Sequence, residues 1–188
     1  MRLAIFASGT GSNLLAIHDA ILTGSLKAEL VLVVVDRLDA PVIEKSHARG
    51  LHTLVLSPKN FNNKVEYEKV ILEELVKQKV EFIALAGYMR LLTTTILNPY
   101  KGKIVNVHPS LLPKYKGKDA IGQAIAAKET TYGVTIHYVD EGMDTGTIIS
   151  QKSFFDDSRD RTQIERKIHA LEHELYARTL KEIWEGLK

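Results

Sequence analysis

The sequence predicts an α/β fold: a single doubly wound, mostly parallel sheet with helices on both faces and an antiparallel addition in the C-terminal half. Its apolar runs are continuous rather than alternating, which is typical of strands buried on both faces. The runs recur between segments with helical periodicity, as in folds built from parallel strands and crossover helices. The last two runs are joined by a loop rich in Gly and Asp, which favours an antiparallel pair.

Seven segments are expected to form strands. The four clearest are the buried runs at residues 2–7, 30–35, 82–86 and 104–108, with a shorter strand near residues 52–56. Residues 132–138 and 147–154 form the pair in the second half, and the loop between them covers residues 140–146.

Three amphipathic helices are expected between and after these strands. The first begins after Ser12 as its N-cap and ends at Gly24. Its apolar face carries Leu14, Ile17 and Ile21. The apolar face of the second carries Tyr67, Ile71, Leu72, Leu75 and Val76, and that of the last carries Ile164, Ile168, Leu171 and Leu175.

The composition indicates one domain over residues 1–188 that acts on small molecules. With 45% hydrophobic residues, the chain is long enough to bury most of its apolar surface in one core. The formal charge of +2 is spread along the sequence, so no nucleic-acid surface is expected. The longest apolar run, residues 30–35, is far shorter than the roughly 20 residues that span a bilayer, so no membrane contact is expected. The absence of cysteine excludes disulfides and thiolate sites and fits a cytoplasmic protein.

A glycine loop, residues 8–13 (Ser-Gly-Thr-Gly-Ser-Asn), follows the first strand and opens the first helix. Backbone N–H groups at such a helix start suit a phosphate, and Ser12 and Asn13 can both donate to phosphate oxygens. The alternative is a tight structural turn. Asp36 suggests a dinucleotide fold, but Leu14 stands where the third fingerprint glycine belongs. No lysine follows the glycines, so a P-loop is excluded.

Asn106 and His108 lie two residues apart at the end of a predicted strand, so their side chains share one face. The strand ends in open α/β sheets are where ligands bind. An amide donor can stabilise an oxyanion, and a protonated histidine can stabilise charge or give a proton, so the pair suits acyl transfer. A capping pair at a strand end is the alternative. Asp144 would favour imidazolium if its loop folds back over this edge, although an aspartate in such a loop is commonly a turn former.

Residues 8–13, the segment 106–113 (Asn-Val-His-Pro-Ser-Leu-Leu-Pro) and residues 140–146 together resemble the phosphoribosylglycinamide formyltransferase family. The resemblance spans the whole chain. It implies direct transfer of formyl from 10-formyltetrahydrofolate to the amine of glycinamide ribonucleotide in purine (IMP) biosynthesis, through a tetrahedral intermediate. It implies that the reaction uses no metal and forms no covalent enzyme intermediate. The protein is expected to be a monomer or a homodimer.

The resemblance also implies roles for individual residues. Asn106, His108 and Asp144 would be catalytic, with the N-terminal half binding the ribonucleotide and the C-terminal half the folate and the catalytic loop. The ribonucleotide would contact Gly11, Ser12, Asn13 and Glu172. The folate would contact Lys64, Met89, Arg90, Leu91, Leu92 and Asn106.

The loop at residues 114–123 departs from the family. Some relatives carry histidines and an arginine where this chain has Asp119, Ile121 and Gly122, so a histidine role there does not transfer. Two related activities are rivals: methionyl-tRNA formyltransferase and the hydrolase that releases formate from the same folate. Both would need extra domains. The rival from another class is a non-enzymatic Rossmann-type nucleotide-binding module, which leaves the Asn106 and His108 spacing unexplained.

Overall fold

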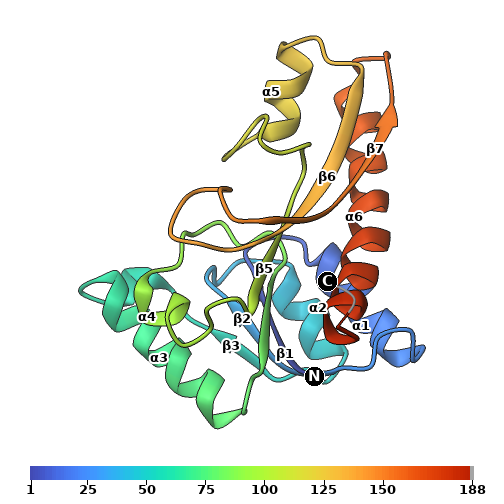
Figure 1. Ribbon diagram of the computed structural model, residues 1–188. Helices are drawn as coiled ribbons and strands as arrows, with labels where there is room; N and C mark the ends of the chain where they lie inside the picture. Colours follow the sequence, from blue (N-terminus) through green and yellow to red (C-terminus); the bar gives the residue numbers. More distant parts are fainter. Residues whose placement is uncertain (187–188) are drawn as a thin grey trace.

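A seven-stranded sheet forms the centre of the protein, of which a computed structural model describes residues 1–186 (Figure 1). The strands are β1 Arg2–Ala7, β2 Glu29–Val35, β3 Thr53–Val55, β4 Phe82–Leu85, β5 Ile104–His108, β6 Thr131–Tyr138 and β7 Ile148–Phe155. Their order is β3-β2-β1-β4-β5-β6-β7. The first five strands pair in parallel, whereas β6 and β7 each pair antiparallel with the strand before them. The predicted parallel sheet with an antiparallel addition is therefore confirmed.

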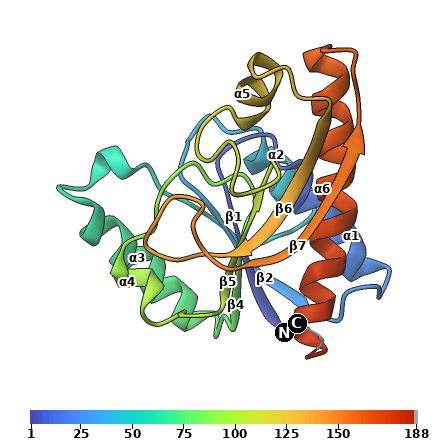
Figure 2. The ribbon, with the colours of Figure 1, turned by 45° about the horizontal axis from the view of Figure 1, so that its top comes forward.

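Helices cover both faces of this sheet (Figure 2). They are α1 Ser12–Leu22, α2 Val42–Ala48, α3 Lys64–Lys77, α4 Thr94–Leu97, α5 Ala120–Ala126 and α6 Arg161–Trp184, with a 3-10 turn at Pro58–Asn60. Ile5 of β1 packs in a core with α1, α2 and α6, and the next residue, Phe6, packs in a second core with α3 and α4. Both residues are fully buried, which explains why the strand sequence shows no polar alternation.

Two local expectations were wrong. The N-cap of α1 is Gly11 rather than Ser12, because the chain enters the helix through a left-handed residue (φ 76°) that glycine adopts without strain. Val76 does not share the apolar face of α3: it is 65% exposed, since Leu75 beside it takes the buried position. The seven strands agree with the prediction to within one residue at each end, whereas α2, α4 and α5 were not predicted.

Tyr176 ties α6 to the centre of the sheet. Its hydroxyl lies 3.0 Å from the carbonyl oxygen of Leu85 on β4 and 3.1 Å from that of Val105 on β5, and the side chain is fully buried.

Tyr176→Phe is expected to lower the free energy of unfolding by about 1–3 kcal/mol, because it leaves the two buried carbonyl groups without this donor. Urea denaturation measures the loss. Tyr100→Phe is the matched control, since the Tyr100 hydroxyl has one acceptor, the Val80 carbonyl, at 3.3 Å. A Tyr176 variant as stable as wild type would contradict the bridging role.

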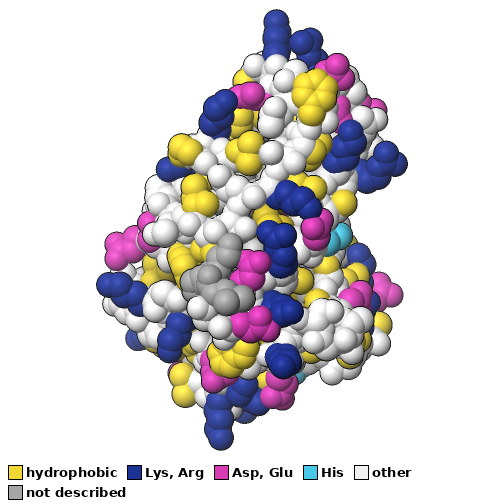
Figure 3. Space-filling view, turned by 45° about the vertical axis from the view of Figure 1, so that its right-hand side comes forward, with side chains coloured by type: hydrophobic (Ala, Val, Ile, Leu, Met, Phe, Trp, Pro, Cys, Tyr) yellow, Lys and Arg dark blue, Asp and Glu magenta, His cyan; other side chains and the backbone are white. Residues whose placement is uncertain are grey.

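The surface carries both signs of charge. On the side of the molecule that carries α6, Lys and Arg side chains are interspersed with Asp and Glu (Figure 3). Within residues 1–186, no helix combines the length and apolar character needed to cross a membrane.

Candidate active site

The candidate site lies where the strand order of the sheet reverses. After β1 the chain moves outward to β2 and β3, then returns to place β4 on the other side of β1. Ligand sites of open α/β sheets form at the carboxyl ends of the strands beside such a reversal. Here those ends carry the glycine loop after β1, the segment 87–92 after β4, and His108 at the end of β5.

Asn106 and His108 lie on the same face of β5, as alternation along a strand requires. The antiparallel register places His137 of β6 opposite Asn106. His137 Nε2 is 3.2 Å from the Asn106 amide nitrogen and 3.5 Å from Asp144 Oδ1, while its Nδ1 donates to the Tyr138 carbonyl. The amide nitrogen of Asn106 carries two hydrogens, so its contact with His137 leaves at least one of them for a ligand.

His108 is buried between two acceptors. Its Nδ1 lies 3.4 Å from Asp144 Oδ2, and its Nε2 lies 2.8 Å from the carbonyl oxygen of Tyr115. The same Asp144 oxygen accepts from the Gly117 N–H at 2.7 Å. The structure thus brings His108 and Asp144 together, and a doubly protonated imidazole would satisfy both neighbours.

The pKa of the Asp144 carboxyl lies below its ordinary value, so this side chain is ionised at neutral pH. Burial alone would raise the pKa of its carboxyl, but hydrogen bonds from His137 and the Gly117 N–H, with the attraction of His108, hold the pKa at about 2. The residue is also in the left-handed region (φ 51°), which is uncommon for aspartate and sets the direction of its side chain.

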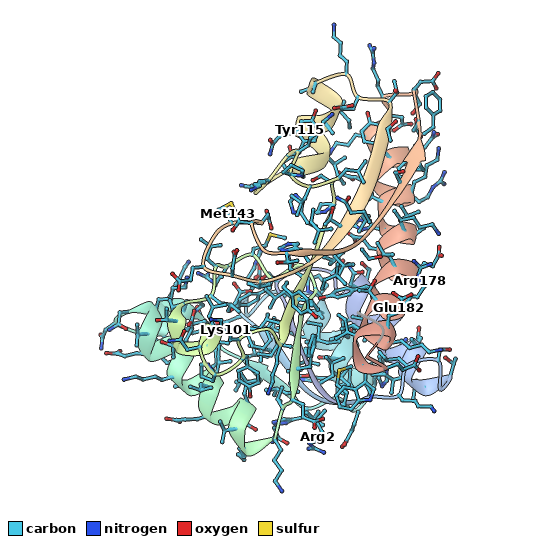
Figure 4. The ribbon with its side chains drawn as sticks, viewed as in Figure 1. Arg2, Lys101, Tyr115, Met143, Arg178 and Glu182 are labelled. Carbon is cyan, nitrogen blue, oxygen red and sulfur yellow. The ribbon has the colours of Figure 1, made fainter. Side chains whose placement is uncertain are left out.

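A cavity of about 600 Å³ adjoins this cluster. Its walls include Met89, Arg90, Leu91 and Leu92, and the full lining is residues 85, 87–92, 106–109, 117–121, 137, 139, 140 and 142–144. The segment before α5 and the β6–β7 connection lie side by side at this cavity, as Tyr115 and Met143 mark in Figure 4. Met89, Leu91 and Met143 are exposed, so the mouth of the cavity offers apolar contacts.

The glycine loop lies next to this cavity. The Ser8 N–H donates to the Gly87 carbonyl at 3.1 Å, and the Ser8 hydroxyl accepts from the Met89 N–H at 2.9 Å. No side chain caps the N-terminus of α1, and its first turn contains no acidic residue. The N–H groups of this turn are therefore suited to an anion.

Asn13 and Glu172 are in contact although they lie 159 positions apart in the sequence. The Asn13 amide donates to Glu172 Oε2 at 2.9 Å, and the His169 ring nitrogen Nδ1 lies 3.0 Å from the same oxygen. Both Asn13 and Glu172 are buried, and Asn13 Oδ1 has no hydrogen-bond partner in the part of the chain that the structure describes. The hydrogen bond to Glu172 raises the pKa of His169. The Asn13 side chain thus points toward α6, and its backbone faces the loop.

Comparison with known proteins assigns the family. Residues 1–180 match the family model described as formyl transferase. This chain belongs to the formyl transferase family.

Relatives of this formyl transferase match along nearly its whole length. The phosphoribosylglycinamide formyltransferase of Bacillus subtilis is 46% identical over 97% of this chain and 94% of its own. The crystal structure of glycinamide ribonucleotide transformylase 1 from Geobacillus kaustophilus is 49% identical, covers 97% of each chain and superposes with a TM-score of 0.94. A trifunctional purine biosynthetic protein adenosine-3 of Drosophila pseudoobscura is 40% identical over 95% of this chain, which covers 13% of that protein.

Asp36, the residue that suggested a dinucleotide fold, has another partner in this formyl transferase. Its buried carboxylate accepts from Arg90 Nε at 2.6 Å. The carboxylate is too deeply buried to meet a ribose hydroxyl, and the relatives are formyltransferases, so the Rossmann-type alternative is not favoured.

Two of the residues expected to contact the folate are not placed like the others, which line the cavity with their side chains accessible. Leu92 lines the cavity but is buried within the core of α3 and α4. Lys64 is the exposed first residue of α3 and is not among the residues that line the cavity.

Asp119 and Gly122, two of the residues at which this chain differs from some relatives, fit one another in the structure. Asp119 precedes α5 with φ 55°, and its carboxylate accepts from the Arg161 guanidinium at 2.8 and 3.3 Å. A Cβ on residue 122 would lie 2.2 Å from Asp119 Oδ2, so Gly122 leaves the space that Asp119 fills. Together Asp119 and Gly122 join α5 to the start of α6.

Three contributors to the site were missed from the sequence. His137 depends on the register between β5 and β6, and Gly117 contributes a backbone N–H, so neither leaves a pattern in the sequence. His169 does leave one, because it lies three residues before Glu172 on a helix and therefore shares its face.

Gly11→Ala is expected to lower the free energy of unfolding by about 1–3 kcal/mol and to raise KM for the ribonucleotide, through strain and overpacking. The new Cβ would lie 2.4 Å from Val42 Cγ2. Gly24→Ala is the matched control, because Gly24 has a similar φ of 75° and no atom within 4 Å. Thermal denaturation and kinetics check both variants. Equal effects of the two substitutions would mean that the Val42 contact does not matter.

Proposed function

We propose that this chain transfers the formyl group of 10-formyltetrahydrofolate to the amine of N1-(5-phospho-D-ribosyl)glycinamide, in purine (IMP) biosynthesis in the cytoplasm. One observation carries the proposal: the half-buried cluster of Asn106, His108 and Asp144 lines a cavity suited to a large, partly apolar donor, beside a glycine loop suited to a phosphate. The names of the relatives support the same activity.

In the proposed reaction, the substrate amine attacks the formyl carbon and forms a C–N bond. The formyl oxygen becomes an oxyanion, which the free amide hydrogen of Asn106 and the imidazolium of His108 stabilise. His108 gives its proton to the folate nitrogen as the bond from carbon to that nitrogen breaks, and it regains a proton from the attacking nitrogen, which becomes the formamide N–H. Asp144 orients His108 through its Nδ1. No metal takes part in the proposed reaction.

Proton donation by His108 requires a change in its contacts. Its Nε2 points at the Tyr115 carbonyl and its Nδ1 at Asp144, so neither N–H is free for a substrate. Ser110 stabilises the turn that carries the Tyr115 carbonyl, because the Ser110 hydroxyl donates to the carbonyl of the preceding residue, Lys114, at 2.6 Å. We therefore infer that the segment before α5 shifts when the formyl donor binds.

We assign the remaining substrate-binding residues to the two halves of one formyl transferase domain over residues 1–188. Residues 187 and 188 lie outside the described part of the chain. The backbone of Gly11, Ser12 and Asn13 would hold the phosphate, and Glu172 would contact the rest of the ribonucleotide. The residues assigned to the folate are Lys64, Met89, Arg90, Leu91, Leu92 and Asn106. Glu172 belongs to the last helix, so the N-terminal half does not complete the ribonucleotide site by itself.

An absorbance assay tests the proposal. Purified protein is mixed with 10-formyltetrahydrofolate, with and without glycinamide ribonucleotide, and release of tetrahydrofolate is followed. Release only with the ribonucleotide is expected. Release without it would indicate the hydrolase instead, and no release in either case would reject formyl transfer.

A further inference from the structure

Lys45 of α2 lies against the glycine loop. Its ammonium nitrogen is 2.8 Å from the carbonyl oxygen of Thr10. The residue is half-buried, and no carboxylate lies within ion-pair distance of it among residues 1–186. A cation without an acidic partner thus lies at the loop.

Backbone contacts hold α2 in this position. The Val42 N–H donates to the Gly9 carbonyl at 3.1 Å. Gly11 packs so closely on Val42 that no side chain fits between them. Lys45 follows Val42 by three residues on the same helix, so its side chain extends from the same face toward the loop.

A phosphate at this loop would lack charge compensation from the loop itself. Phosphate monoesters carry a charge of about −1.5 to −2 at neutral pH, and residues 8–13 contain no cation. The carboxylate of Glu172, bonded to Asn13, adds negative charge nearby, and His169 is engaged with that carboxylate. The ammonium of Lys45 is hydrogen-bonded directly to the loop.

We propose that Lys45 is a further substrate-binding residue, whose ammonium donates to the phosphate of the ribonucleotide and makes the site prefer phosphorylated substrates. An ammonium has three hydrogens, and Thr10 takes one, so two remain for phosphate oxygens. Lysine commonly binds phosphate in this way, as a point charge. The inference rests on the proposed function, because that function supplies the phosphate.

Lys45→Met is expected to raise KM for glycinamide ribonucleotide by about 10- to 100-fold with little change in kcat, since charge-assisted hydrogen bonds have roughly this effect. KM for 10-formyltetrahydrofolate should stay constant. Activity with the unphosphorylated glycinamide riboside should also be unchanged. Lys45→Arg should recover part of the loss. The matched control is Lys103→Met, which removes an exposed lysine before β5 and should leave both KM values unchanged.

The alternative is that Lys45 only braces the loop. In that case Lys45→Met would weaken riboside and ribonucleotide equally, and this result, or an unchanged KM, would overturn the proposal. A binding measurement tests the role of Lys45 separately from the proposed formyl transfer. If wild type transfers no formyl group but binds ribose 5-phosphate more tightly than ribose, and Lys45→Met removes that preference, Lys45 is still a phosphate ligand. Equal preference in wild type and variant would reject it.

Discussion

His108→Ala is expected to lower turnover by on the order of 10²-fold or more while affinity for both substrates is mostly kept. The imidazole is the group in the cluster that can give a proton, and general acid-base catalysis contributes about 10²- to 10⁴-fold. Because His108 is buried between Asp144 and the Tyr115 carbonyl, its removal takes away charge at the reacting atoms rather than substrate-binding surface. Steady-state kinetics with both substrates measures kcat and KM separately.

His52→Ala provides the control, since His52 is a half-exposed residue that pairs with Glu74 near β3. This variant should turn over as wild type does. Near-normal turnover by the His108 variant would remove that residue from the mechanism. A loss of binding without a loss of kcat would assign it to substrate affinity.

Asp144→Asn is expected to lower kcat by on the order of 10²-fold, the lower end of what acid-base groups contribute, because His108 Nδ1 loses the carboxylate that orients it at 3.4 Å. The Gly117 N–H and His137 lose a charged acceptor as well. Steady-state kinetics measures the loss, and an unchanged kcat would make Asp144 structural.

The same substitution has a separate effect on acid stability. The folded pKa of Asp144, about 2, lies below the ordinary value of 3.8, so its ionised form stabilises the folded state. That contribution is fully present above about pH 4 and is lost as pH falls toward 2. The Asn variant should therefore differ most from wild type in stability above pH 4. Asp157→Asn, at an exposed position after β7, is the control and should show neither effect.

The sheet could be predicted because its strands are buried on both faces. A residue such as Phe6 packs against α3 while its neighbour Ile5 packs against α1, and this leaves a continuous apolar run in the sequence. The cap of α1 could not be predicted in the same way. Ser12 suits an N-cap by propensity, but the contact between Gly11 and Val42 moves the start of the helix, and that contact is tertiary.

The parts of the candidate site that come from neighbouring residues could be predicted, and the parts that depend on tertiary contacts could not. Asn106 and His108 share a strand, so their alternation already puts them together. The approach of Asp144 depends on how the β6–β7 connection folds back, and the position of His137 depends on strand register. Local sequence determines neither.

The bond between Asn13 and Glu172 has a consequence for synthesis of the chain. Every residue that lines the 600 Å³ cavity precedes residue 145, whereas Glu172 belongs to the last helix. A nascent chain that has left the ribosome only through β7 contains every residue that lines the donor cavity but not the partner of its phosphate loop. Substrates that require both parts can therefore stabilise the protein only after α6 has emerged and docked on α1.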